Sequence, residues 1–209
     1  IVEQEGLLAA LTFSWERDHT DNPIVATRGH YFRIDLEWAP AAEFAEYYYV
    51  RAEPTVQAYR GFLGLRNTVL AARLACGVAE PLGSSESLLP SKRFYSGGAS
   101  SMRGFQRREL GPKDEISEAP LGGDAKVEGS VELRFPGYRR LRGAAFVDAG
   151  QVWATTDDVR TDNIEVAVGT GLWLDTIIGP IRGDVAYRLT DYDKTQDRWA
   201  FHLSIGPAF

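Results

Sequence analysis

Cysteine is almost absent from this chain of 209 residues, because Cys76 is the only one. A single thiol excludes an intrachain disulfide and a metal centre built from cysteines. Histidine is nearly as rare, and the histidines at positions 19, 30 and 202 show no metal-ligand spacing. We therefore predict no metal site and no cofactor.

Long apolar runs are also missing. No run reaches the roughly eighteen residues of a membrane helix, and the chain opens without a signal peptide. The missing signal does not imply a cytoplasmic protein, because a chain that opens with strand-like Ile1 and Val2 can be a fragment. The formal charge of −6 and the pI near 5.2, with no strongly basic face or run, argue against a nucleic-acid-binding surface.

The sequence is rich in alternation of apolar and polar residues, the pattern of β-strands. Ordinary strands have about five or six residues, whereas tilted membrane-spanning strands need about nine to eleven. The predicted strands are mostly about nine to twelve residues long, which favours the second class. Nine segments show the pattern, at 7–16, 31–38, 46–58, 67–78, 126–135, 141–150, 164–174, 181–189 and 199–209.

The two faces of these strands differ in a way that indicates a membrane. One face is aliphatic or aromatic throughout, and the other carries charges of both signs, as expected for a wet lumen. Short turns at 136–140 and 176–179 alternate with longer loops at 154–163 and 190–198. We predict an all-β fold, a transmembrane antiparallel β-barrel, with a soluble β-sandwich or a lipocalin-like barrel as the alternative. Aromatic residues near strand ends fit interfacial girdles, namely Trp15, Trp38, Trp153, Trp199 and Phe209.

The longest segment without alternation, 79–125, is predicted to be a functional loop. Its Gly97-Gly98 pair permits backbone shapes closed to other residues. Arg103 stands between bulky apolar neighbours, and a guanidinium buried there needs carboxylate partners. No Gly-x-Ser-x-Gly elbow and no phosphate-binding Gly-Lys-Ser/Thr motif accompany the loop, so we predict no enzyme activity.

Several motifs in a fixed order resemble the BamA/TamA superfamily of outer-membrane assembly factors. The resemblance covers nearly the whole chain and corresponds to the C-terminal half of a barrel of about sixteen strands. Met102 departs from the Val or Ile that is usual in the family. The motifs are Phe-Tyr-Ser-Gly-Gly at 94–98, Met-Arg-Gly-Phe at 102–105, Gly-Gly at 122–123, Ser-Val-Glu-Leu-Arg-Phe-Pro at 130–136, Ala-Phe-Val-Asp-Ala-Gly at 145–150, Gly-Pro-Ile-Arg at 179–182 and Ser-Ile-Gly-Pro-Ala-Phe at 204–209.

The resemblance implies that the 79–125 loop folds back into the barrel and is anchored there. Arg103 would pair with Glu132 and Asp148 on the two strands that follow, while Phe105 and Tyr95 would pack against the lumen wall. The strand pattern agrees, because Glu132 lies on a polar face and Asp148 lies near the end of its strand. The loop motif comprises Phe94, Tyr95, Gly97, Gly98, Met102, Gly104 and Phe105.

The last predicted strand resembles the C-terminal signal by which outer-membrane barrels are assembled. Gly206 and Pro207 weaken its pairing near the chain end. In the family this strand closes the barrel against the first strand, and the resulting weak seam is proposed to open toward lipid. The signal comprises Trp199, Phe201, Leu203, Ile205, Gly206 and Phe209.

These features predict an outer-membrane assembly, insertion or translocation factor in a bacterium, or in an equivalent organelle membrane. The expected partners are outer-membrane lipid or lipopolysaccharide, client β-barrel or secreted polypeptides, and periplasmic or lipoprotein accessory subunits, but no nucleic acid. Residues 1–209 would form the C-terminal part of the barrel, with about seven strands and periplasmic POTRA modules preceding them. The alternatives are a two-partner-secretion transporter, a passive channel, or the barrel anchor of a lipase-like enzyme.

Overall fold

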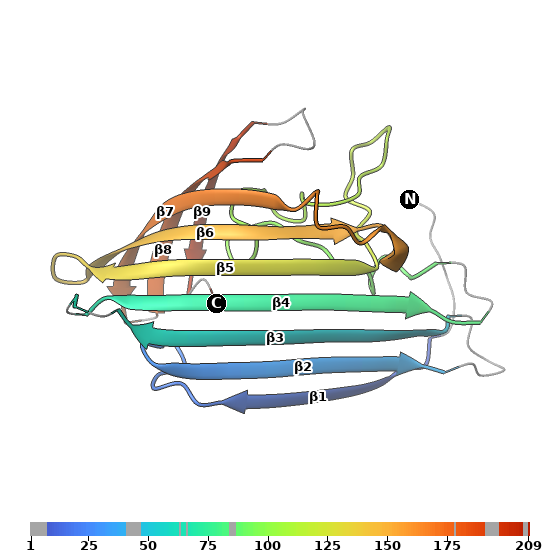
Figure 1. The fold of residues 1–209 in the computed structure, drawn as a ribbon, viewed down its shortest axis with the longest axis horizontal. Coiled ribbons are helices and arrows are strands. Elements are labelled where there is room, and N and C mark those ends of the chain that lie inside the picture. Colours follow the sequence, from blue (N-terminus) through green and yellow to red (C-terminus); the bar gives the residue numbers. More distant parts are fainter. Residues whose placement is uncertain are drawn as a thin grey trace.

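The structure, a computed structural model, describes residues 8–40, 47–62, 64–65, 67–83, 87–177, 179–190, 197–206 and 209. The described residues form one antiparallel sheet of nine strands, each paired with its neighbours in the sequence (Figure 1). No helix in this part of the chain is both long and apolar enough to cross a membrane. The strands are β1 (Leu11–Asp18), β2 (Gly29–Ala39), β3 (Tyr49–Gly61), β4 (Val69–Pro81), β5 (Ala125–Pro136), β6 (Leu141–Trp153), β7 (Glu165–Thr176), β8 (Gly179–Arg188) and β9 (Trp199–Ile205).

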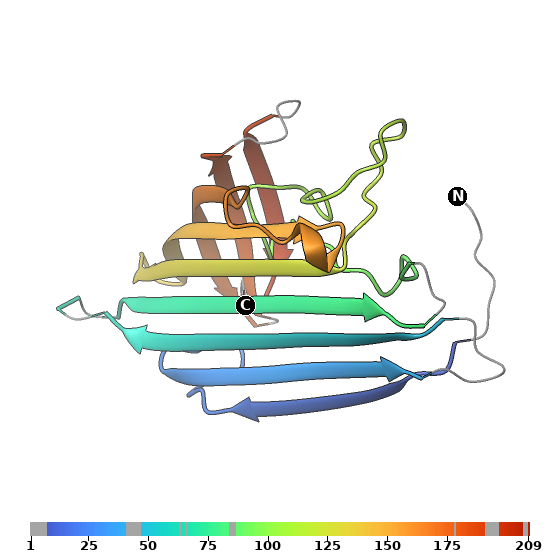
Figure 2. The same cartoon turned by 45° about the vertical axis from the view of Figure 1, so that its right-hand side comes forward.

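The sheet curls, so that β7 to β9 rise out of the plane of β1 to β4 (Figures 1 and 2). We call residues 82–124 the inserted loop, and its described residues, 82–83 and 87–124, lie on the concave side. We call the end of the sheet where this loop leaves β4 the loop end, and the end with the 137–140 turn the turn end. Within the described residues β1 and β9 do not pair, so the sheet is an open part of a barrel.

The predicted strands are confirmed, with shifts at their ends. The first strand begins at Leu11 rather than residue 7, which lies outside the described residues. The pairing of Val131 with Val147 and of Phe201 with Val185 keeps apolar side chains together on the convex face. Val131 is 50% exposed, whereas the adjacent Glu132 is fully buried. This contrast is the expected one for a greasy exterior and a polar, charged interior.

Two aromatic residues assigned to the interfacial girdles lie elsewhere. Trp153 is buried, and its indole N–H donates to Asn163 Oδ1 at 3.2 Å, so it is covered by the 154–164 loop rather than facing lipid. The assignment of Phe209 to the outward row was also wrong. β9 ends at Ile205, and the Phe209 ring stacks on Tyr59 with centroids 6.3 Å apart.

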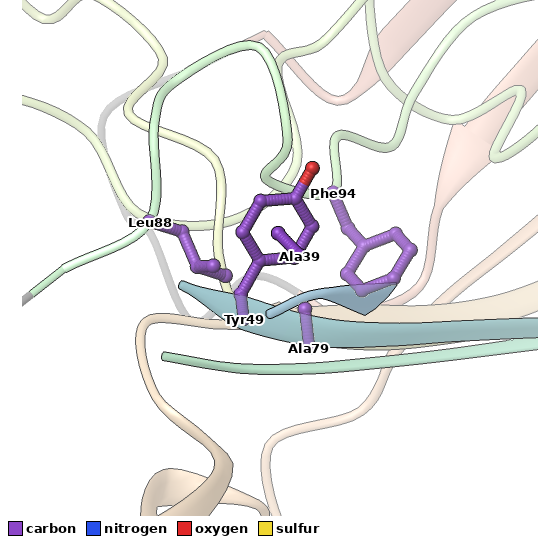
Figure 3. Packing of buried hydrophobic residues seen from close by; sticks show 5 residues of the cluster. All are labelled: Ala39, Tyr49, Ala79, Leu88 and Phe94. Carbon is purple, nitrogen blue, oxygen red and sulfur yellow. The ribbon is translucent and has the colours of Figure 1, made fainter. Parts of the chain in front are cut away.

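The base of the inserted loop packs on the concave face at the loop end (Figure 3). Phe94 lies over the sheet with Tyr49 and small alanines, which leave room for the ring. Gly77 of β4 is needed for the same reason, because a Cβ there would lie 2.6 Å from the Phe94 ring. The cluster consists of Ala39, Tyr49, Ala79, Leu88 and Phe94.

A second cluster lies at the turn end and includes Phe209. Its ring packs against Ala26, Tyr59, Val69 and Ala71, and the Tyr59 hydroxyl donates to the Phe209 carbonyl at 3.2 Å. The last described residue therefore lies on the lumenal side of β3, remote from it in the sequence.

A double-mutant cycle tests this Phe209–Tyr59 contact. Replacing both rings with leucine is expected to show a coupling free energy of about 1 kcal/mol, the usual value for an aromatic pair. Urea unfolding of the purified protein in detergent would measure it. Strict additivity of the two single substitutions would mean that the rings do not meet in the folded protein.

Candidate loop anchor

The inserted loop makes a compact turn around its arginine. The Gly98 N–H donates to the carbonyls of Met102, at 3.2 Å, and Phe105, at 3.0 Å. Gly97 and Gly98 have φ angles of 108° and 113°, in a region that favours glycine. A Cβ on Gly97 would lie 2.3 Å from the Gln106 carbonyl oxygen. The backbone at both positions therefore adopts a conformation that favours glycine, as the sequence predicts.

The turn places the Arg103 guanidinium between β5 and β6. Nε donates to Asp148 Oδ2 at 2.7 Å and Nη2 to Asp148 Oδ1 at 2.6 Å, a two-pronged contact. Nη1 donates to Glu132 Oε2 at 2.5 Å, and Nη2 also reaches Ser130 Oγ at 2.9 Å. The structure thus brings together the three predicted anchor residues, which we call the loop anchor, and Arg103 is only 1% exposed.

Packing around the loop anchor excludes water and fixes its orientation. The Arg103 Cζ atom lies 3.3 Å from the centroid of the Phe146 ring, so the guanidinium stacks on an aromatic face. The side chains of Met102, Phe105 and Leu110 form a buried cluster beside it. His202 of β9 bonds to the Arg103 carbonyl at 2.9 Å, which confirms that this histidine points inward.

Glu132 joins the loop anchor to further charges that sequence reasoning did not assign to the site. It pairs with Arg134 Nε at 2.8 Å and with Arg182 Nη2 at 3.1 Å, and Arg182 pairs with Asp184 at 2.7 Å. The cluster contains three arginines and three carboxylates, so its formal charge is balanced. For the charges on β5 and β8, the parity of the polar strand face was the available signal. The six side chains of the cluster are Arg103, Arg134, Arg182, Glu132, Asp148 and Asp184.

The two carboxylates of the loop anchor stabilise the charged form of the loop arginine. Burial lowers the pKa of the Arg103 guanidinium, but hydrogen bonds and charge from Asp148 and Glu132 outweigh burial and raise its pKa above the ordinary value. At the last residue of the inserted loop, burial raises the pKa of the Asp124 carboxyl. The positive charge of Arg93, 3.9 Å away, lowers that pKa but does not outweigh burial. Arg103 also lies closer to its carboxylates, at 2.5 and 2.6 Å, than Arg93 does to Asp124.

Two predicted packing roles have different outcomes. Phe105 does meet the wall, because the Arg188 Cζ atom of β8 lies 4.6 Å from its ring centroid. The corresponding prediction for Tyr95 was wrong. Its hydroxyl donates to the carbonyls of Pro90, at 3.1 Å, and Leu121, at 3.4 Å. Both acceptors belong to the inserted loop, so Tyr95 links two parts of the loop to each other. Phe94 takes the place on the wall.

The predicted C-terminal signal lies partly in β9 and partly beyond its end. The apolar side chains of β9 point outward and are exposed, as predicted, whereas Gly206 has a φ angle of 109° and lies beyond the strand. Pro207, which the sequence predicts to weaken pairing, lies outside the described residues. Among the described residues, no group of three or more His, Cys, Asp or Glu side chains is placed to hold a metal ion. The exposed row consists of Trp199, Phe201, Leu203 and Ile205.

Comparison with known proteins gives consistent matches. The Omp85 superfamily domain matches residues 3–209. An outer membrane protein assembly factor BamA from Neisseria meningitidis is 33% identical over 165 residues, covering 74% of this chain and 20% of that protein. A SAM50-like protein from Schizosaccharomyces pombe is 29% identical over 133 residues, covering 63% of this chain and 27% of that protein. The chain thus spans well under a third of these relatives.

A solved structure shares the fold. BamA from Haemophilus ducreyi lacking POTRA domains 1–3 superposes with a TM-score of 0.77 and 20% sequence identity. The match covers 92% of this chain and 41% of that one. The predicted fold class, a membrane β-barrel of which this chain forms a part, is confirmed by this likeness.

Proposed function

We propose that this chain, which belongs to the Omp85 superfamily, is the part of an outer-membrane protein assembly factor that holds the inserted loop inside the barrel. The chain is an outer-membrane protein, as its sequence predicts. The observation that carries the proposal is the loop anchor, in which one buried guanidinium bridges the loop to two strands. The names of the BamA and SAM50-like relatives support assembly over the alternative functions.

We also propose that residues 1–209 form the C-terminal part of the barrel and that further strands and POTRA modules precede them. Support comes from the two outer edges, of β1 and β9, which pair with no other described strand. In this arrangement the loop end faces the exterior of the cell and the turn end faces the periplasm. The short turns between β5 and β6 and between β7 and β8 at the turn end are typical of that side.

The finer mechanism concerns the seam between the last strand and the first. β9 has seven residues, against ten in β8, and its pairing with β8 stops at Ile205. A short strand with a free edge is weakly held and can template another strand. We propose that a client β-strand pairs with this edge before it enters the membrane.

The partners follow from this mechanism. Clients are β-rich outer-membrane or secreted polypeptides, and the exposed apolar row meets outer-membrane lipid or lipopolysaccharide. Periplasmic or lipoprotein subunits assist. The proposed activity is the docking of client strands rather than catalysis, in line with a relative that is named an assembly factor.

Reconstitution tests the activity. The intact protein in liposomes is expected to fold an unfolded β-barrel client several-fold faster than empty liposomes do, as measured by the gel shift of folded barrels. The substitution Ser204→Cys in β9, in a Cys76→Ser background, should allow cross-linking to a cysteine in the client's last strand. Val131→Cys, on a central strand, is the matched control. Equal cross-linking at both positions would rule out the seam, and equal folding rates would rule out the activity.

A further inference from the structure

A cavity of about 520 Å³ lies at the turn end of the sheet. The 19–28 loop, the start of β4 and the turn between β5 and β6 form its walls. It lies away from the edge of β9 and adjoins the loop anchor only through Arg134, which pairs with Glu132. We call it the turn-end cavity.

The turn-end cavity is lined by arginines without acidic residues. Among the described residues that line it, none is Asp or Glu. Arg142 is paired with Asp175 at 2.8 Å and Arg134 with Glu132 at 2.8 Å, but both carboxylates lie outside the lining. A wall of guanidinium groups favours an anion with several acceptor oxygens. The arginines are Arg28, Arg134, Arg139 and Arg142.

Two buried donors at the cavity have no acceptor within the described part of the chain. They are Nη2 of Arg134, a residue 6% exposed, and Nε1 of Trp173, a residue 2% exposed. The Arg134 Cζ atom lies 4.8 Å from the Trp173 ring centroid, so the two groups are neighbours. Buried donors are almost always paired in folded proteins, and two unpaired ones side by side indicate an acceptor that the chain itself does not supply.

Arg139 occupies its place in the turn at a cost. Its φ angle is 57°, where glycine or asparagine is more stable than arginine. The turn is closed by the Leu141 N–H, which donates to the Tyr138 carbonyl at 3.0 Å. A strained arginine at the mouth of an arginine-lined cavity is consistent with a binding role for its side chain.

The cavity also reaches the lipid-facing side of the sheet. Phe135 and Leu141, which line it, belong to the convex apolar row and are 41% and 40% exposed. Tyr138 is 74% exposed at the tip of the same turn. An aromatic tip and arginines at the end of an apolar band mark the level of lipid headgroups.

We propose that the turn-end cavity binds a phosphate group, carried by a lipid headgroup or free in solution. Arg134 Nη2 and Trp173 Nε1 donate to its oxygens inside, while Arg28 and Arg139 close over it at the mouth. In the lipid case, the acyl chains continue along Phe135 and Leu141.

Calorimetry on the intact protein in a neutral detergent tests the site with two probes, inorganic phosphate and a short-chain phosphatidic acid. Arg139→Asn is expected to weaken binding about tenfold or more, the loss that follows removal of a charge-assisted hydrogen bond. The same substitution relieves the strained φ angle, so the unfolding midpoint should stay unchanged or rise. Arg134→Gln should abolish binding, with the gel shift of the folded barrel confirming its fold.

Arg160→Asn is the matched control, because Arg160 is exposed in a loop at the opposite end of the sheet. It should leave binding unchanged. Binding of the lipid alone would identify a headgroup site, and binding of inorganic phosphate alone a solute site. If neither probe binds the unmodified protein, or if Arg160→Asn weakens binding as much as Arg139→Asn, the proposal is wrong and the cavity holds only water.

Discussion

Replacing Arg103 with alanine is expected to release the inserted loop from the wall while the strands stay paired. The substitution leaves the fully buried Asp148 without its guanidinium, and breaking a buried pair in this way costs about 3–5 kcal/mol. That cost falls on the docked state of the loop, because the strand ladders on either side do not include Arg103. Limited proteolysis of the folded barrel should show faster cleavage within residues 82–124.

Two further variants separate the anchor from a general effect of charge. Arg107→Ala removes an exposed arginine from the same loop and should leave cleavage unchanged. Arg103→Lys keeps the charge but cannot make the two-pronged contact with Asp148, so an intermediate cleavage rate is expected. Unaltered protease resistance in Arg103→Ala would show that the loop is held by its packing alone, and the anchor would not be needed.

The alternation of the strands was sufficient to predict which side chains face the lumen. Glu132 and Asp148 lie on lumenal faces because side chains alternate along a strand, a local property. The pairing of Arg103 with them is not local, because it spans 29 and 45 residues along the chain. The family resemblance supplied that step. Neither argument assigned Arg182, since which lumenal charges meet depends on how the sheet curls.

Two of the three incorrect predictions share a physical cause, because each treated a side chain as if its own strand alone decided its environment. Trp153 has the parity of the outward row, but the 154–164 loop folds over it. Phe209 was counted as part of the last strand, yet Gly206 turns the chain at a φ angle of 109° and the ring reaches Tyr59. Tyr95 bonds to carbonyls of its own loop, a contact that no periodic pattern encodes.

Adding a single methyl group at position 104 is expected to undo the docking of the loop without touching any charge. A Cβ on Gly104 would lie 2.5 Å from the Ala167 Cβ of β7 and 3.0 Å from Arg188 Cγ. The arginine stem can move, but the alanine is fixed to a paired strand. Overpacking of this kind costs about 1–3 kcal/mol. Gly104→Ala should therefore shift the neighbouring Arg103 and raise loop cleavage toward the Arg103→Ala level.

A second substitution should relieve the clash. Ala167→Gly removes the atom that the new methyl would meet, so the double variant should recover much of the protease resistance lost in Gly104→Ala. The single variant Ala167→Gly should weaken the strand slightly, by about 0.5–1 kcal/mol, because glycine costs backbone entropy. A double variant whose cleavage equals that of Gly104→Ala would mean that position 104 does not rest on β7. The order of the four cleavage rates thus tests the placement of the loop independently of its salt bridges.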